Sequence, residues 1–415
     1  MRDRVVICIA ALLVSGCSSS SPGNATVVPN RALAPTTSGG YTVTVLPSLG
    51  GTNSAANSIN GRGWPMGTSF LSGNTTMHAA LWRNGNVTDL GTLGGPNSAV
   101  EWPVENDKGY VSGISETSHK DPLGESTSWS CHAFLPDNGS SGDTCLGFVW
   151  HAGHMHHLPT LGGNNGYGAG MNEDEVVGWA ETKRHDSTCI APQVLQFLPT
   201  VWHLSTRKAR ALPTLTLRGK TEPDGAATAI NKEGDIVGIS GICDQAVGRF
   251  TARHAVLWKN DKPDEPIELQ TIGGTAWNTP TAINDAGQIV GFLDKDLRDR
   301  KGNPNFISVI WTDPQSAPTK IGTLPGDNVS EPTSINNEGA VLGVSFPSSH
   351  VYVWQNGMIT DLTNVVLQAY PELEPVSVGG INDRGEIAGQ ACQLVSGKCP
   401  SSGATFVTFL AVPNE

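Results

Sequence analysis

Short apolar runs alternate with polar turns along the chain after residue 40, and one nine-residue pattern keeps returning. INDAGQIVG at 283–291 recurs as INKEGDIVG from 230, INNEGAVLG from 335 and INDRGEIAG from 381, and looser copies are SINGRGWPMG from 58, VENDKGYVSG from 104 and MNEDEVVG from 171. In each copy an Asn ends an apolar run, and its side chain can bond the backbone of the turn that follows. Each copy is therefore interpreted as an antiparallel hairpin.

Two further markers fall between the hairpins. Apolar runs that end in Trp stand at 78–82, 147–150, 199–202, 254–258, 308–311 and 351–354, and connectors follow as LGTLGG from 90, LPTLGG from 158, LQTIGG from 269 and IGTLPG from 321. Self-similarity with a period of about 50 residues and four short strands per unit is typical of a β-propeller or a solenoid. The six Trp are expected to pack between neighbouring units.

The two ends of the repeat region favour a closed ring. Residues 41–51 read as a fourth strand and a connector without a Trp strand before them, and residues 404–413 read as a third strand without a fourth after it. Pairing the two segments would hide both edges. The expectation is an all-β, seven-bladed β-propeller over residues 41–413, with four antiparallel strands per blade and closure by the N-terminal and C-terminal strands.

These repeats resemble the HAF-type extracellular repeat family, whose units carry a His-Ala-Phe-like strand start and an Ile-Asn-x-x-Gly-x-x-Val-Gly hairpin. The resemblance covers residues 41–413 and implies a propeller-like exported protein, but it implies little about activity. A literal HAF stands at 132–134, yet GFVW at 147–150 has the better spacing for a strand. The segment CHAFLPDNGSSGDTC is therefore interpreted as part of an insertion, and the strand assignment of 116–146 stays open.

Length varies most between the second and third strands of a unit, which places insertions at 116–146, 180–199, 240–253, 292–306 and 390–403. In a propeller these loops share one face with the connectors, so this face is the expected binding surface. Six cysteines lie in these insertions, and disulfides are expected in an exported protein. Six cysteines allow 15 pairings; proximity favours Cys131 with Cys145 and Cys392 with Cys399, which leaves Cys189 with Cys243.

Residues 1–16 have the pattern of a signal peptide, with Arg2 and Arg4 before a short apolar run. Small residues before Cys17 resemble the bacterial lipoprotein cleavage box, which implies lipidation of Cys17 and attachment to a membrane. Ser18 resembles the outer-membrane sorting pattern of a Gram-negative bacterium. Residues 17–40 are rich in Ser, Pro and Gly and read as a flexible tether. Which side of the outer membrane the protein faces stays open.

The composition and net charge limit which kinds of partner the protein can bind. The chain has 49 Gly, 27 Pro and a formal net charge of -12. An acidic chain argues against nucleic-acid binding. The expected partners are the membrane, through the lipid anchor, and a protein or glycan ligand, and the expected state is a monomer.

Few residues suggest a catalytic, metal-binding or ligand-binding role. His151, His154, His156 and His157 are interpreted as solvated turn residues, NEDE at 172–175 as an acidic turn, and DKDLRDR at 294–300 as a charged loop. No catalytic residue, metal site or cofactor is predicted. Trp102, Trp129 and Trp277 depart from the repeat and are candidates for stacking on a ligand ring.

The sequence favours a non-catalytic binding or scaffold module of the cell envelope. Two alternatives stay open: a polysaccharide-active lyase or hydrolase with a site in the central mouth, and a purely structural envelope protein. Convergent titratable groups with displaced pKa values would favour an enzyme. Exposed aromatic or apolar patches on the insertion face would favour a binder.

Overall fold

The computed structural model describes residues 36–38 and 40–414, apart from 105, 128–130, 132, 137–141, 244–251, 275–276 and 296–304. The predicted signal peptide, Cys17, most of the predicted tether and Trp129 lie outside the described residues. The described chain is all-β apart from one helix, α1 (Thr363–Ala369), and one 3-10 turn, η1 (Glu125–Thr127). Neither is long and apolar enough to cross a membrane.

The strands form four-stranded units, numbered here in chain order. Their bounds are as follows: unit 1, β3 (Gly50–Ile59), β4 (Pro65–Leu71), β5 (Met77–Arg83), β6 (Asn86–Asp89); unit 2, β7 (Gly94–Ala99), β8 (Val111–Lys120), β9 (Asp143–His151), β10 (His154–His157); unit 3, β11 (Gly162–Met171), β12 (Glu175–His185), β13 (Leu195–His203), β14 (Ala209–Ala211); unit 4, β17 (Asp224–Ile230), β18 (Ile236–Gly241), β19 (His254–Lys259), β20 (Lys262–Glu268); unit 5, β21 (Asn278–Ile283), β22 (Ile289–Asp294), β23 (Phe306–Trp311), β24 (Thr319–Gly322); unit 6, β25 (Val329–Ile335), β26 (Val341–Phe346), β27 (His350–Gln355), β28 (Met358–Asp361); unit 7, β29 (Leu373–Ile381), β30 (Ile387–Gln393), β31 (Phe406–Pro413), β2 (Tyr41–Val45).

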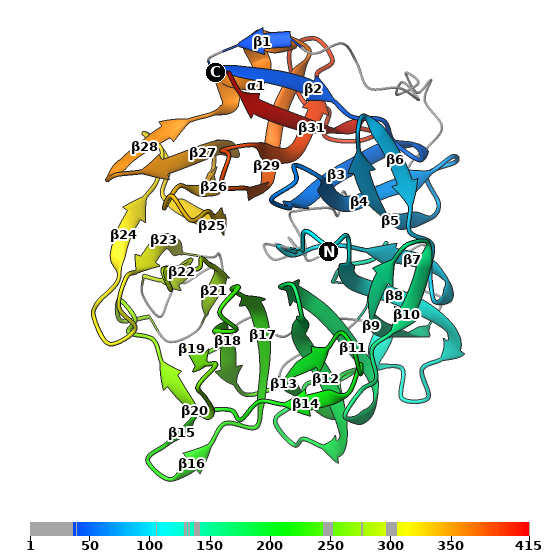
Figure 1. Ribbon diagram of the computed structural model, residues 1–415, viewed down its shortest axis with the longest axis vertical. Helices are drawn as coiled ribbons and strands as arrows, with labels where there is room; N and C mark the ends of the chain where they lie inside the picture. The colour runs from blue at the N-terminus through cyan, green and yellow to red at the C-terminus, as the bar shows by residue number, and fades with distance from the viewer. Residues whose placement is uncertain are drawn as a thin grey trace, which may run out of the picture.

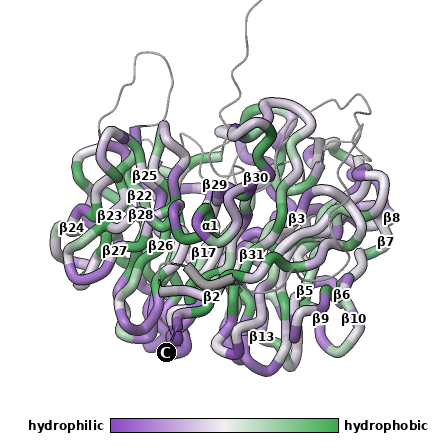
Figure 2. Tube along the Cα trace, turned by 90° about the horizontal axis from the view of Figure 1, so that it is seen from above, coloured by the Kyte–Doolittle hydropathy of each residue, from purple (hydrophilic) through white to green (hydrophobic). Residues whose placement is uncertain are grey.

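Within each of units 1 to 6, successive strands pair side by side and antiparallel. The units surround a common centre, with first strands such as β17, β21 and β25 near it and fourth strands such as β20, β24 and β28 at the periphery (Figure 1). This radial arrangement of separate sheets is that of a β-propeller. In the side view, hydrophobic residues follow the strands and hydrophilic residues gather in loops at the two ends (Figure 2).

Unit 7 joins the two ends of the described chain, as expected from the sequence. β2 pairs with β31 in antiparallel register, from Tyr41 opposite Pro413 to Val45 opposite Phe409. A single bridge between Asn53 and Phe406 continues this sheet into unit 1. The structure adds a short strand, β1 (Thr36–Ser38), which pairs with β2 inside the segment expected to be tether.

The Asn of each hairpin turn connects its unit to the next. Its Oδ1 accepts a backbone hydrogen bond from its own turn, for example from Ala340 to Asn336. Its Nδ2 donates to the backbone carbonyl of the next turn Asn at 2.9–3.0 Å, in the order Asn60, Asn106, Asn172, Asn231, Asn284, Asn336, Asn382 and back to Asn60. Both ends of the amide are used, which explains why the repeat keeps this residue.

The last Gly of the repeated hairpin faces an irregular point of the first strand. At Gly67, Gly238 and Gly343, a Cβ would overlap the carbonyl oxygen of Ala55, Ala226 and Glu331 respectively. At this point the first strand has a register shift, for example between Ala56 and Ser58. Gly is therefore required for close packing beside a bulge.

The strand-ending Trp pack between units, as predicted. The indole nitrogens of Trp82, Trp202, Trp258 and Trp311 donate to backbone carbonyls in the connector that enters their own unit, at 2.7–2.8 Å. Trp258 of unit 4 shares an apolar cluster with Val177 and Val201 of unit 3. Burial of large aromatic side chains thus holds neighbouring sheets together.

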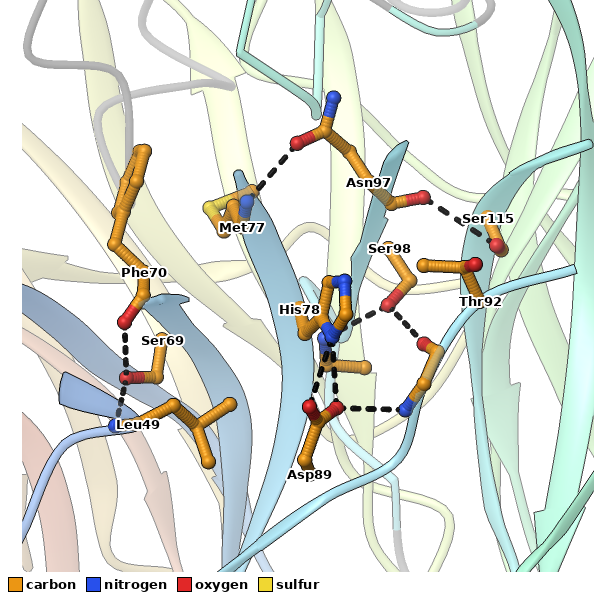
Figure 3. A network of polar contacts seen from close by, with 12 residues as sticks. Leu49, Ser69, Phe70, Met77, His78, Asp89, Thr92, Asn97, Ser98 and Ser115 are labelled. Carbon is orange, nitrogen blue, oxygen red and sulfur yellow. Dashed lines mark hydrogen bonds and ion pairs between the residues drawn. The ribbon is translucent and has the colours of Figure 1, made fainter. Parts of the chain in front are cut away.

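Polar contacts hold the connectors in place and explain the His that begins the third strand in the His-Ala-Phe-like motif. Figure 3 shows His78 beside Asp89 and, next to this pair, Ser98, which donates to the connector carbonyl of Gly91. The Nδ1 atom of His78 lies 2.8 Å from Asp89, and equivalent pairs join His254 to Glu268 and His350 to Asp361. The motif His therefore ties a third strand to the acid at the end of the fourth strand.

Candidate functional site

The long loops lie where the sequence predicted them. They join the second and third strands of units 2, 3, 4, 5 and 7, at 121–142, 186–194, 242–253, 295–305 and 394–405. Parts of the predicted insertions are extensions of strands, because β8 runs to Lys120 and β9 begins at Asp143. GFVW lies in β9, and residues 131, 133–136 and 142 of the segment with the literal HAF form no strand, whereas its last three residues, 143–145, begin β9. The end of the molecule that carries these loops is called the insertion face below.

Three disulfides fasten these loops. The pairs are Cys131–Cys145, Cys189–Cys243 and Cys392–Cys399, which are the pairs that sequence proximity favoured. The first and third close loops within one unit. The second joins the insertions of units 3 and 4, so it connects two neighbouring sheets.

A central cavity of about 520 Å³ is lined by residues of all seven units. Phe134, Ser348, Ser349 and Cys399 from loops between second and third strands contribute to its wall. Among the described residues, none from the turns that follow the linked asparagines lines it. The cavity therefore lies toward the insertion face, and its volume falls within the range of small-molecule sites.

The bulges of the first strands supply much of the wall. The residue three positions before the turn Asn lines the cavity in every unit; these residues are Asn57, Pro103, Ala169, Thr228, Thr281, Thr333 and Gly379. In units 1 and 3 to 7 this residue lies at a register shift of the first strand, whereas Pro103 of unit 2 lies beyond the end of β7. Such a bulge re-aims a side chain out of the regular alternation of a strand. Each unit therefore contributes to the cavity wall one residue whose type varies, while the hairpin that carries it is repeated.

Aromatic side chains from six units surround the cavity: Phe70, Trp102, Phe134, Tyr167, Trp179, Trp277, Phe292, Phe346 and Phe406. Two of the three predicted stacking residues, Trp102 and Trp277, are thus brought together here, and Trp129 lies outside the described residues. Trp277 packs edge-on against Phe306 with ring centroids 5.0 Å apart. Their planar faces and the apolar wall suit a ring-bearing ligand.

Three carboxyl groups, Glu101 of unit 2, Glu331 of unit 6 and Glu374 of unit 7, also line the cavity. Glu101 and Glu331 each stand five positions before the turn Asn of their unit. Burial raises the pKa of both well above the usual range of a glutamate. The Oε2 atom of Glu101 accepts a hydrogen bond of 3.2 Å from Asn57, and the side chain is 5 % exposed.

Several polar atoms in this wall have no hydrogen-bond partner among the described residues. They are Asn57 Oδ1, Glu101 Oε1, Trp102 Nε1, Tyr167 Oη, Thr279 Oγ1, Glu331 Oε1, Thr333 Oγ1 and Ser377 Oγ. A buried polar atom without a partner costs about 1 to 3 kcal/mol. Their concentration around one cavity indicates a site whose hydrogen bonds are completed by an occupant or by water.

A separate carboxylate network joins the insertion of unit 2 to unit 3. Glu125 of η1 accepts hydrogen bonds from the backbone of Val194 and Leu195 at 2.9 and 2.6 Å. The Gln193 amide donates to both Glu125 and Glu181, at 3.3 and 3.0 Å. Burial, with the nearby charge of Glu125, raises the pKa of Glu181 to about 7. This network clamps two insertions together and lies outside the cavity wall.

The other polar motifs lie away from the cavity. His154, His156 and His157 are exposed on β10, and His151 stacks on Tyr110 with ring centroids 4.0 Å apart. Glu173 and Asp174 of the acidic turn contact Lys108 of the neighbouring turn. Most of the charged loop at 294–300 lies outside the described residues. Within the described part of the chain, no cluster of three or more His, Cys, Asp or Glu is arranged to hold a metal ion.

Comparison with known proteins returns likenesses of shape only. No family model and no curated protein matches the chain. Similar solved structures include the β-propeller domain of the Trilobed protease from Pyrococcus furiosus, at 11% identity and TM-score 0.44 over 82% of this chain and 98% of that one. A gluconolactonase from Xanthomonas campestris matches at 9% identity and TM-score 0.37 over 95% and 99% of the two chains. A protein of unknown function from Dyadobacter fermentans matches at 9% identity and TM-score 0.36, over 94% and 99%. Likenesses this low assign no activity to this chain.

Proposed function

We propose that the chain is a binding module of the cell envelope that holds a small ring-bearing organic ligand in its central cavity. The observation that carries the proposal is the combination of an aromatic wall with polar atoms that lack partners among the described residues. The repeated bulge makes the wall variable without disturbing the frame, which suits recognition. The cysteines fasten the loops around the mouth.

The proposed architecture is a closed seven-bladed propeller, in which each four-stranded unit is one blade. Two observations support closure: the pairing of β2 with β31, and the chain of asparagine hydrogen bonds that returns from Asn382 to Asn60. Closure would fix the width of the cavity, because each wall strand is held by neighbours on both sides.

The proposed location is the outer membrane of a Gram-negative bacterium, through lipid on Cys17, and the HAF-type resemblance agrees with export. Three disulfides favour an oxidising compartment. Replacing Cys17 with Ser should move the protein from the membrane fraction to the soluble fraction of the envelope. A Cys17→Ser variant that stays in the membrane fraction would contradict lipid anchoring.

A cavity-filling substitution tests the proposed site. Thr333 lines the cavity, and its hydroxyl has no hydrogen-bond partner among the described residues. Thr333→Trp should block ring compounds such as tryptophol and glucose in saturation-transfer NMR, whereas the nearly isosteric Thr333→Val, which only removes one hydroxyl, should weaken their binding far less. Binding that survives equally in Thr333→Trp would place the site elsewhere.

A second candidate is a glycan-cleaving enzyme, because Glu101 and Glu331 bring two carboxyl groups with raised pKa values to one cavity. A protonated carboxyl can act as the general acid of glycoside hydrolysis. Glu101→Gln and Glu331→Gln should then each abolish release of reducing ends from an oligosaccharide that the wild type cleaves. Retention of that cleavage by both variants would exclude these two residues as its catalysts.

A further inference from the structure

The charged side chains of the cavity wall are all acidic. Glu101, Glu331 and Glu374 line it, and among the described lining residues none is Lys, Arg or His. A ligand that carries a negative charge would therefore enter a site that offers it no counter-charge. A ligand that carries a positive charge would meet carboxyl groups from units 2, 6 and 7.

The polar atoms left without a partner in the described part of the wall include three amide or carboxyl oxygens, beside one indole N–H and four hydroxyls that can donate or accept. Asn57 uses its Nδ2 to donate to the carbonyl of Val100 at 2.8 Å and to Glu101, so its Oδ1 is the atom that remains. The Oε1 atoms of Glu101 and Glu331 also remain. The three oxygens and the hydroxyls can accept hydrogen bonds, so they suit an ammonium group, which has three donors and no acceptor.

The aromatic rings of the cavity wall also favour a positively charged ligand. Trp102, Tyr167 and Trp277 line the same cavity as the carboxyl groups. The face of an aromatic ring attracts a cation, most strongly where water is excluded. The formal net charge of -12 adds a long-range field of the same sign.

We infer that the central cavity selects an organic cation, a ring-bearing molecule with an ammonium group, in preference to its neutral or anionic counterpart. This inference rests on the proposed function. The ammonium group would lie against Glu101 and Glu331, and the ring against Trp102 and Trp277.

Binding of such a ligand should change the protonation of the carboxyl groups of Glu101 and Glu331. Burial raises the pKa of both carboxyl groups, and the phenols that face them are Tyr167 beside Glu101 and Tyr352 beside Glu331, whose pKa values burial also raises. A bound cation supplies a counter-charge that lowers the pKa of the carboxyl groups, so binding should be accompanied by proton release and the affinity should rise with pH. A neutral ligand should show no such dependence.

Three probes that share an indole ring separate the outcomes: tryptamine, tryptophol and indole-3-acetate. Isothermal titration calorimetry of the disulfide-intact protein should give about tenfold tighter binding for tryptamine than for tryptophol, and no measurable binding of indole-3-acetate. In Glu101→Gln and Glu331→Gln, the ratio of tryptamine affinity to tryptophol affinity should fall, whatever the change in tryptophol binding itself. Persistent tryptophol binding also shows that each variant remains folded.

Two results would overturn the inference, and they are distinguishable. Equal or tighter binding of tryptophol or indole-3-acetate would remove the preference for a cation but leave the cavity as a ligand site. Failure of all three probes to bind would contradict the proposed function as well. Tryptamine binding that is unchanged in both Gln variants would show that the carboxyl groups are not its partners.

Discussion

At the scale of single residues, the turn asparagine explains the repeat better than any other position. Its amide serves two turns at once, because Oδ1 accepts from its own turn and Nδ2 donates to the next one. Asp has no donor and Ser reaches only one partner, so neither can replace it. The residue that follows makes its contacts to neighbouring turns at exposed positions. It varies among Gly61, Asp107, Glu173, Lys232, Asp285, Asn337 and Asp383.

Adjacent asparagines in unit 6 offer a matched test. Asn336 is 5 % exposed and links two units, whereas Asn337 is exposed and bonds the carboxylates of Asp285 and Asp383 at the surface. Asn336→Ala leaves buried partners unsatisfied and should lower the free energy of unfolding by about 2 to 4 kcal/mol. Asn337→Ala should lower it by less than about 1 kcal/mol. Urea unfolding at fixed temperature measures both, and equal losses would contradict a special role for the inner asparagine.

Glu181 should make stability depend on pH. Its pKa rises from an ordinary 4.5 to about 7 in the fold, so the folded state holds a proton that the unfolded state has released between these values. The free energy of unfolding should therefore fall as pH rises from 4.5 to 7, by about 3 kcal/mol from this group.

A Glu181→Gln variant isolates that contribution. Asp224, whose pKa burial and the hydrogen-bonded Asp186 raise to about 9, destabilises both proteins in the same direction as pH rises. The difference between wild type and variant should hence shift in favour of the variant by about 3 kcal/mol between about pH 5 and pH 8. Urea unfolding across that range supplies the measurement, and parallel pH curves would rule out titration of Glu181.

At the scale of elements, the sequence predicts what repeats and misses what departs from the repeat. Hairpins, Trp strands and the position of the long loops follow from periodicity, because each unit must bury the same faces against its neighbours. Helix α1 and the small hairpin of β15 (Thr216–Leu217) and β16 (Lys220–Thr221) lie in connectors, where nothing in the repeat predicts them.

The candidate site was predictable only in part, and for a physical reason. Trp102 and Trp277 stood out because they depart from the pattern, whereas Glu101 and Glu331 resembled ordinary polar residues of a strand. Their common offset of five positions from the turn Asn is the signal that was available. It becomes meaningful only once the bulge is known, because the bulge changes which side chains face the centre.

Strand β2, which pairs with the C-terminal strand β31, is the element whose removal should lower the stability most. Val43 and Val45 are buried in an apolar cluster shared by units 6 and 7 and helix α1, and their loss would also leave β31 with an unpaired edge. Deleting residues 1–45 should cost about 5 kcal/mol or more, at about 1.5 to 3 kcal/mol for each buried aliphatic side chain plus the lost ladder. Deleting residues 1–35 keeps β2 and serves as the control.

Thermal unfolding followed by circular dichroism, on proteins produced under oxidising conditions, compares the two deletions. A sharp loss of melting temperature or of cooperativity is expected for the longer deletion alone. If both deletions melt like the full chain, the terminal pairing would contribute nothing to stability and closure would have to rest on the asparagine contacts.

At the scale of the whole molecule, the disulfides differ in what they connect. Cys189–Cys243 spans a separation of 54 residues and joins two neighbouring sheets, whereas Cys392–Cys399 spans 7 residues within one unit. A cross-link restricts the unfolded chain more when it closes a longer loop, which corresponds to about 4 kcal/mol for the first bond and about 2 kcal/mol for the second. Replacing each pair with serines and measuring urea unfolding without reductant tests this order. Greater damage from loss of Cys392–Cys399 would mean that strain or packing at that loop outweighs chain entropy, and that the link between units 3 and 4 is redundant with the interface between those sheets.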